Sequence, residues 1–123
     1  MLVTGLLESI SGFSVSGSQM NKHQRAIEEL KTKGETTFKA FGNSMTPILK
    51  SGSLLTFRPL PEYEIGDIVF CKVRGRYIDA HKITKKDKLG DSYRYMIANN
   101  HGWENGWTKQ IYGKAVKVVS PNG

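Results

Sequence analysis

The sequence predicts a mainly β fold: a coiled antiparallel sheet or partial barrel with one short helix near its N-terminus. Only one segment, residues 21–33, combines the capping and spacing signals of a helix. Short runs rich in β-branched and aromatic residues follow it, separated by turns that contain glycine or proline. Many short strands with one helix bury their apolar faces by bending a sheet over a common core. A chain of 123 residues is long enough for one such core.

The predicted helix has recognisable ends. Asn21 can accept a hydrogen bond from the backbone of the first turn while Gln24 reaches back, which is the capping-box arrangement. Ile27 and Leu30 form a narrow apolar stripe, which we expect to face the core. Gly34 can end the helix in the left-handed conformation.

After the helix, the domain is predicted to consist of strands. They are expected at residues 36–41, 54–59, 67–73, 76–84, 93–98 and 110–119. Residues 1–19 are rich in glycine and serine and lack periodicity. They are predicted to be a flexible arm, or a segment that precedes an alternative start at Met20. Residues 20–123 then form a single domain, with its β core over residues 36–119.

The net charge of +7, from 18 basic and 11 acidic residues, makes an anionic partner such as nucleic acid conceivable. Such a partner is not favoured, because the charges are dispersed and a single helix cannot make a helix-turn-helix. The sequence contains no apolar run of about 18 residues, so no membrane span is predicted.

The histidines and the cysteine do not predict a metal site or a cofactor. His23, His81 and His101 are far apart in sequence, and Cys71 is the only cysteine. The apolar surroundings of Cys71 predict a buried, reduced thiol, which suits the cytoplasm.

The segment FGNSMTPILKSG, residues 41–52, places a serine among turn-forming residues. The Ser44 hydroxyl can simply shape the turn. It can also act as a nucleophile if a neighbouring base takes its proton. His81 is the strongest candidate base because its ordinary pKa lies near neutrality, and Lys82 and several carboxylates are the other candidates. Strand neighbours face opposite sides, so we expect His81 alone to reach the serine.

Five blocks of sequence resemble the serine peptidase superfamily of signal peptidases and LexA-type self-cleaving repressors. In chain order they are GNSMTP, Gly52, EIGDIVFCKVRGRYIDAHKI, ANNHGWENGW and IYGKAVKV, all between residues 37 and 119. The first resembles the family's G-x-S-M-x-P turn, in which Ser44 matches the nucleophile. His81 matches the base position and resembles the histidine of endoplasmic-reticulum-type and archaeal signal peptidases. The resemblance implies the coiled-sheet core of signal peptidases and the LexA C-terminal domain.

The group that would orient the histidine is where this sequence departs from the family. The histidine branch uses an aspartate from the block that here begins ANNHGWEN. Asn99 and Asn105 occupy the aligned acidic positions, and Glu104 is the carboxylate between them. The resemblance leaves these three residues as candidates. An asparagine can hold an imidazole by hydrogen bonding, although it stabilises an imidazolium less than a carboxylate does.

Three further residues are expected to bind the substrate or the oxyanion. Met45 flanks the nucleophile in the family motif. Backbone N–H groups around Ser44 would bind the oxyanion, together with the side chain of Asn43 or Ser53. Ser53 stands where the family usually has an aspartate.

The function implied is that of a soluble serine endopeptidase that cleaves a peptide or protein, or its own chain, at small residues. It would be LexA-like or UmuD-like, or a phage or mobile-element accessory peptidase. Within the arm, Ser11-Gly12 is the expected bond for self-cleavage. The alternative is a catalytically impaired peptidase fold that binds a protein or nucleic-acid partner. LexA-type relatives dimerise through the last strand of the core, so residues 110–119 are expected to support a homodimer.

Overall fold

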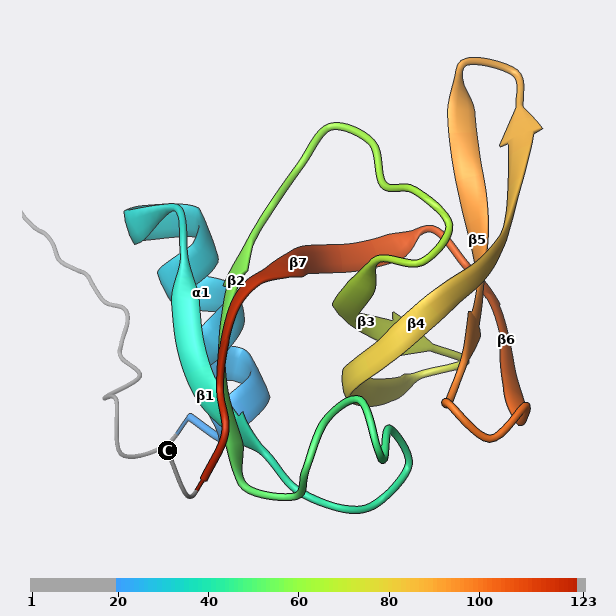
Figure 1. The fold of residues 1–123 in the computed structure, drawn as a ribbon. Helices are drawn as coiled ribbons and strands as arrows, with labels where there is room; N and C mark the ends of the chain where they lie inside the picture. Colours follow the sequence, from blue (N-terminus) through green and yellow to red (C-terminus); the bar gives the residue numbers. More distant parts are fainter. Residues whose placement is uncertain (1–19, 122–123) are drawn as a thin grey trace, which may run out of the picture.

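Within residues 20–121, seven antiparallel strands form one curled sheet, and a single helix packs against its first strand (Figure 1). The computed structural model describes residues 20–121. The predicted mainly β fold with one short helix is confirmed. In chain order the elements are α1 (Lys22–Lys33), β1 (Thr36–Ala40), β2 (Ser53–Arg58), β3 (Ile68–Val73), β4 (Arg76–Leu89), β5 (Ser92–Ala98), β6 (Glu104–Thr108) and β7 (Gln110–Val119).

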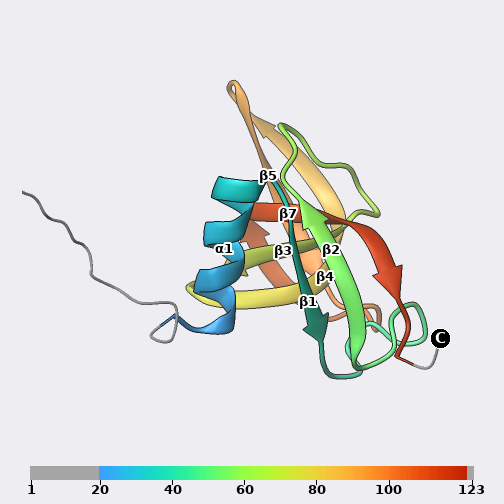
Figure 2. The same ribbon diagram turned by 90° about the vertical axis from the view of Figure 1, so that its left-hand side faces the viewer.

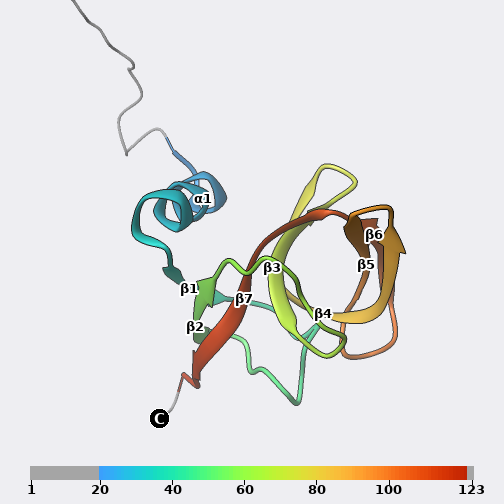
Figure 3. The same ribbon diagram turned by 90° about the horizontal axis from the view of Figure 1, so that it is seen from above.

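The order of strands in the sheet is β1-β2-β7-β3-β4-β5-β6. The last strand therefore lies inside the sheet, pairing with β2 over its second half and with β3 over its first half. Five of the pairings contain a register shift, and such bulges increase the local twist. Viewed from above, β3 to β7 curl around a common interior, which makes the sheet a half-barrel (Figure 3).

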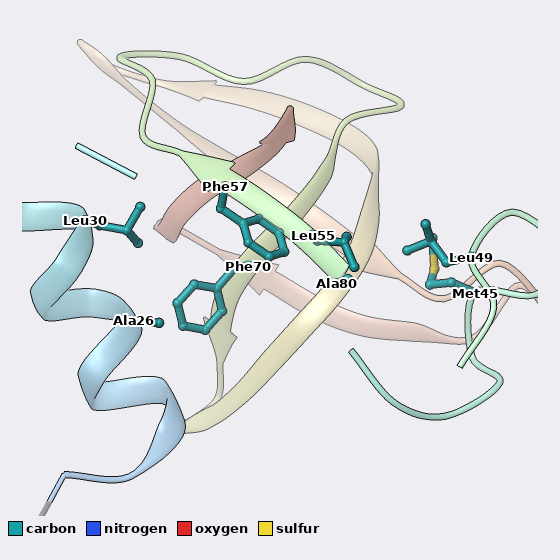
Figure 4. Packing of buried hydrophobic residues seen from close by; sticks show 8 residues of the cluster. All are labelled: Ala26, Leu30, Met45, Leu49, Leu55, Phe57, Phe70 and Ala80. Carbon is teal, nitrogen blue, oxygen red and sulfur yellow. The ribbon is translucent and has the colours of Figure 1, made fainter. Parts of the chain in front are cut away.

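Helix α1 ends where the sequence predicts. The Asn21 side chain accepts a hydrogen bond from the backbone of Gln24, whose own side chain bonds back to the backbone of Asn21. Gly34 takes the left-handed conformation with φ of 79°. The buried face, however, consists of Ala26 and Leu30, whereas Ile27 is only half-buried. The helix lies beside β1 (Figure 2), and Ala26 and Leu30 pack in the same cluster as Phe57 and Phe70 of the sheet (Figure 4).

The core consists of two clusters on either side of the central strands. In the first, Phe57 and Phe70 are completely buried and pack between Leu30 of the helix and Met45 of the loop after β1 (Figure 4). The second lies between β3, β4 and β5 and includes Ile83. Because the first cluster contains side chains from the helix, the sheet and this loop, it fixes the loop relative to the sheet.

One strand prediction was wrong in its end point, and one further strand was not predicted. The fourth strand was expected to end at residue 84, but β4 continues to Leu89 as one arm of a hairpin with β5. Its charged run is kept extended by cross-strand pairs such as Asp87 with Arg94, whose side chains approach to 3.0 Å. Strand β6 was not predicted, because it is only five residues long and has Gly106 at its centre.

The predicted arm over residues 1–19 and its Ser11-Gly12 bond lie outside the described residues. Within residues 20–121, no helix is long and apolar enough to cross a membrane. Cys71 is free and completely buried, and this burial raises the pKa of its thiol to about 12. The expectation of a buried thiol is therefore confirmed.

We expect Phe70→Ala to lower the free energy of unfolding by about 3–5 kcal/mol, because the ring is fully buried between the helix and β2. Urea denaturation measures the change. Phe41→Ala is the matched control: that ring is 69% exposed, so its loss should cost less than about 0.5 kcal/mol. Equal effects of the two substitutions would contradict the assigned core.

Candidate active site

Ser44 lies in the turn after β1, and two buried side chains fix that turn to the sheet. Met45 and Leu49 are 3% and 5% exposed, and both pack in the cluster that contains Ala80 of β4 (Figure 4). The serine itself is half-buried at the rim of this cluster. A partly exposed serine next to a buried methionine explains how its hydroxyl stays accessible in a turn that is fixed to the sheet.

The turn between β5 and β6 binds the carbonyl groups of the serine turn. The backbone N–H of Asn100 donates to the Ser44 carbonyl at 2.8 Å, and its side-chain amide donates to the Thr46 carbonyl at 3.0 Å. His101 donates from Nε2 to the Asn43 carbonyl at 2.9 Å. Three carbonyls of the serine turn are thus held by two consecutive residues.

Ser44, His81 and Asn105 form a hydrogen-bonded row. The Ser44 Oγ lies 3.0 Å from Nε2 of His81, and Nδ1 of His81 lies 2.7 Å from Oδ1 of Asn105. An amide oxygen can only accept, so Nδ1 must carry the proton and donate it to Asn105. The neutral ring then presents an unprotonated Nε2 to the serine hydroxyl, which is the arrangement that a general base requires.

Burial lowers the pKa of His81 below its ordinary value of 6.5, and this effect outweighs two smaller ones. The hydrogen bond to Asn105 and the charge of Asp79 both act to raise it. The ring is therefore neutral at physiological pH and ready to accept a proton.

A β-bulge in β4 sets the direction of the His81 side chain. His81 pairs with Val69 and Ile78 pairs with Cys71, so β4 advances three residues while β3 advances two. Lys82 pairs with Ile68. Its ammonium donates to Oδ1 of Asn100 at 3.2 Å and not to the serine, as the sequence argument expected.

The other two candidates for the orienting group have different partners. Asn99 accepts hydrogen bonds from the backbone N–H groups of His101 and Trp103, so it shapes the β5–β6 turn. Glu104 is exposed and forms an ion pair with Lys85 at 3.3 Å. Of the three, only Asn105 reaches the imidazole.

Ser53 cannot bind an oxyanion, which corrects the expectation for this residue. Its hydroxyl donates to the Lys50 carbonyl at 2.7 Å, and the residue is 1% exposed. Asn43 contributes its carbonyl to the turn, as acceptor for His101 and Thr46. Within residues 20–121, the backbone N–H groups of Ser44 and Met45 donate no hydrogen bond, so these two are available to a developing negative charge.

A groove of about 200 Å³ begins at Ser44 and His81 and runs between two strands. One wall is the end of β1 with Phe41, and the other is the stretch Tyr77–His81 of β4. Met45 and Leu49 form part of its floor. At one side of the groove wall, Asp79 forms an ion pair with Lys22 at 2.7 Å and a hydrogen bond with Nε2 of His23 at 2.6 Å.

Sequence reasoning did not single out Asn100 and His101, which support the serine turn. Both lie in the block ANNHGWENGW that was considered only as a source of the orienting group. Within the described part of the chain, no group of three or more His, Cys, Asp or Glu side chains could hold a metal ion. Comparison with models of known protein families and with curated proteins finds no match.

The pKa of His81 can be measured by NMR titration of the three imidazoles, assigned with His23→Asn and His101→Asn variants. We expect the resonance of His81 to titrate below the ordinary value of 6.5, because burial disfavours the imidazolium. In Asn105→Asp the added carboxylate should raise this pKa by roughly one to three units. A His81 pKa above 6.5 in the unmodified protein, or none of this rise in the variant, would contradict the assigned geometry.

Proposed function

We propose that this protein is a serine endopeptidase in which Ser44 is the nucleophile and His81 the general base. The observation that carries the proposal is the row of contacts from the Ser44 hydroxyl through His81 to Asn105, at 3.0 Å and 2.7 Å. A turn-forming serine would need only backbone partners. Here the backbone of the turn is held by other residues, and the hydroxyl contacts a neutral imidazole.

In the proposed reaction, Ser44 Oγ attacks the scissile carbonyl as its proton passes to Nε2 of His81. The N–H groups of Ser44 and Met45 stabilise the oxyanion. His81 then returns the proton to the leaving amine, and the same ring activates water to release the acyl group. Asn105 keeps the proton on Nδ1 throughout. Its neutral amide supports the imidazolium less than a carboxylate would, so the reaction is expected to be slow.

The substrate is an extended peptide that adds to the sheet in the groove. Strand β1 is the first strand of the sheet, and β4 pairs with β5 only from Lys82 onwards. Both walls of the groove therefore present strand edges without a neighbouring strand among the described residues. Backbone hydrogen bonds to such edges bind peptides of varied sequence. The groove has a volume of only about 200 Å³, which favours small substrate side chains next to Ser44.

The motif resemblance to signal peptidases and LexA-type proteins supports the same proposal. Within this proposal the protein is a LexA-like or UmuD-like peptidase, or an accessory peptidase of a phage or mobile element. The buried reduced thiol of Cys71 is compatible with a cytoplasmic location.

The competing function is a binding module that has kept the groove and lost catalysis. The observation that favours it is Asn105 itself, because a neutral amide takes the place of the acid. Under this alternative, a peptide binds in the groove and is recovered intact. Nucleic-acid binding rests only on the net charge of +7 and remains the less favoured form of it.

A fluorophosphonate probe distinguishes the two functions, because it labels an activated serine and not an ordinary one. We expect labelling of the unmodified protein, none of Ser44→Ala, and a loss of roughly 10²- to 10⁴-fold in rate for His81→Gln. The rate should rise with pH through the lowered pKa of His81, since only the neutral ring accepts the proton.

Two variants control this experiment. Ser92→Ala removes a hydroxyl in the β4–β5 hairpin, which donates to the Leu89 carbonyl, and should label like the unmodified protein. Lys82→Met removes one hydrogen bond to Asn100 and should slow labelling by less than about tenfold. If Lys82→Met abolishes labelling while His81→Gln retains it, the lysine is the base and the assignment fails.

We also propose that residues 110–119 support a homodimer. Beyond Lys114, β7 pairs with β2 alone among the described residues, so one edge is open to a second copy. Val116, Val118 and Val119 are between 43% and 50% exposed. Sedimentation should show a dimer whose fraction increases with salt, because salt screens the charge of +7 on each chain. A monomer at all salt concentrations and high protein concentration would contradict this proposal.

A further inference from the structure

Asn105 is followed directly by Gly106, and a separate constraint fixes each residue. Asn105 is held by its hydrogen bond from His81. Gly106 is buried, with φ of 133°, and a Cβ there would lie 3.3 Å from both Val73 Cγ1 and Arg74 Nε. Packing around residue 106 therefore requires glycine, and the hydrogen bond from His81 is accepted by asparagine at residue 105. Together they create an Asn-Gly pair, the dipeptide whose side-chain amide is most easily lost, because glycine does not shield its own nitrogen.

We propose that Asn105 is a self-modification site, whose deamidation gives the candidate active site an aspartate. The backbone nitrogen of Gly106 attacks Cγ of Asn105 and forms a five-membered succinimide. The amide nitrogen leaves as ammonia and takes up the proton that the Gly106 nitrogen gives up. Water then opens the ring: its hydroxide adds to a ring carbonyl, and its proton returns to the nitrogen. Opening at Cγ gives aspartate, and opening at the backbone carbonyl gives an iso-aspartyl linkage.

Three features of the structure favour attack at this position. The donated hydrogen bond from Nδ1 of His81 to Oδ1 withdraws electrons from the carbon that is attacked. The guanidinium of Arg74 lies near Gly106, since its Nε would be 3.3 Å from a Cβ built there, and its positive charge favours the negative charge that develops nearby during attack. Ala98 pairs with Glu104 and Ile97 pairs with Gly106, so Asn105 is the extra residue of a bulge, where the strand is less constrained by its ladder.

Deamidation changes the charge of the side chain at residue 105 but leaves that side chain in the same place. An aspartate at residue 105 keeps an acceptor oxygen towards Nδ1 of His81 and adds a negative charge beside the ring. Such a charge stabilises the imidazolium that forms when the serine is deprotonated. Asn105 is thus a positioning residue whose modification increases reactivity with the age of the protein. This consequence rests on the proposed function, whereas the modification itself does not.

The experiment follows the full chain during incubation at mildly alkaline pH. Intact mass and peptide mapping quantify asparagine, aspartate and iso-aspartate at residue 105, and fluorophosphonate labelling is measured on the same samples. We expect aspartate to accumulate at residue 105 and the labelling rate to rise with it, towards that of Asn105→Asp. One pKa unit of added imidazolium stabilisation corresponds to a gain of roughly tenfold.

The chain provides two controls. Asn122-Gly123 is a second Asn-Gly pair in the sequence and reports deamidation under the same conditions. Asn105→Gln keeps an amide but closes a ring slowly, so its labelling should not change with age. The labelling rate should also be measured as a function of pH. If its acid limb moves to higher pH in aged protein, as in Asn105→Asp, the change lies at the imidazole and not in the fold as a whole.

The possible outcomes separate this inference from the proposed function. If residue 122 deamidates while Asn105 remains intact, or gives only iso-aspartate, the inference is overturned, even if Asn105→Asp labels rapidly. If aspartate forms but neither aged protein nor Asn105→Asp reacts with the probe, the modification stands and the peptidase function fails.

Discussion

The candidate active site depends on the docking of the β5–β6 turn against the serine turn. Ser44 lies outside every strand, so no ladder of backbone hydrogen bonds fixes it. Its position is set from one side by the buried Met45 and Leu49, and from the other by Asn100 and His101, which bind the carbonyls of the turn. Each such hydrogen bond contributes only about 1 kcal/mol, but together they remove the freedom of an otherwise irregular loop.

The same segment also controls the imidazole. Five residues after Asn100, the chain reaches Asn105, which fixes the tautomer of His81. Lys82 joins the two halves by binding the Asn100 side chain from the strand that carries the histidine. The serine turn, the His81 imidazole and the amide that orients it are therefore connected through one short stretch of chain, and a displacement of this stretch would disturb all three.

The fold and part of the site could be predicted from the sequence because local signals carry them. Asn21 and Gly34 mark the helix ends, and alternating apolar residues mark most strands. The contact of Ser44 with His81 followed from motif order. The choice of Asn105 over Asn99 and Glu104 could not be predicted, because it depends on the bulge at the start of β6, which no residue pattern specifies. Ser53 was wrongly assigned for a similar reason: whether a hydroxyl faces a groove or the interior depends on packing across strands.

Burial of the ring and the neutral amide of Asn105 act together on the chemistry of His81. Burial lowers the pKa of the imidazole, and an amide offsets this far less than a carboxylate at the same distance would. Under the proposed function, the neutral ring is available as a base at neutral pH, but the imidazolium that would form during the reaction is poorly stabilised. Such a balance suits a reaction that happens once or slowly on a tethered or strand-bound peptide, because high effective concentration compensates for a weak catalyst. The same balance suits rapid turnover of free substrates much less. The charge at residue 105 decides whether the site favours a slow reaction on a bound peptide or rapid turnover.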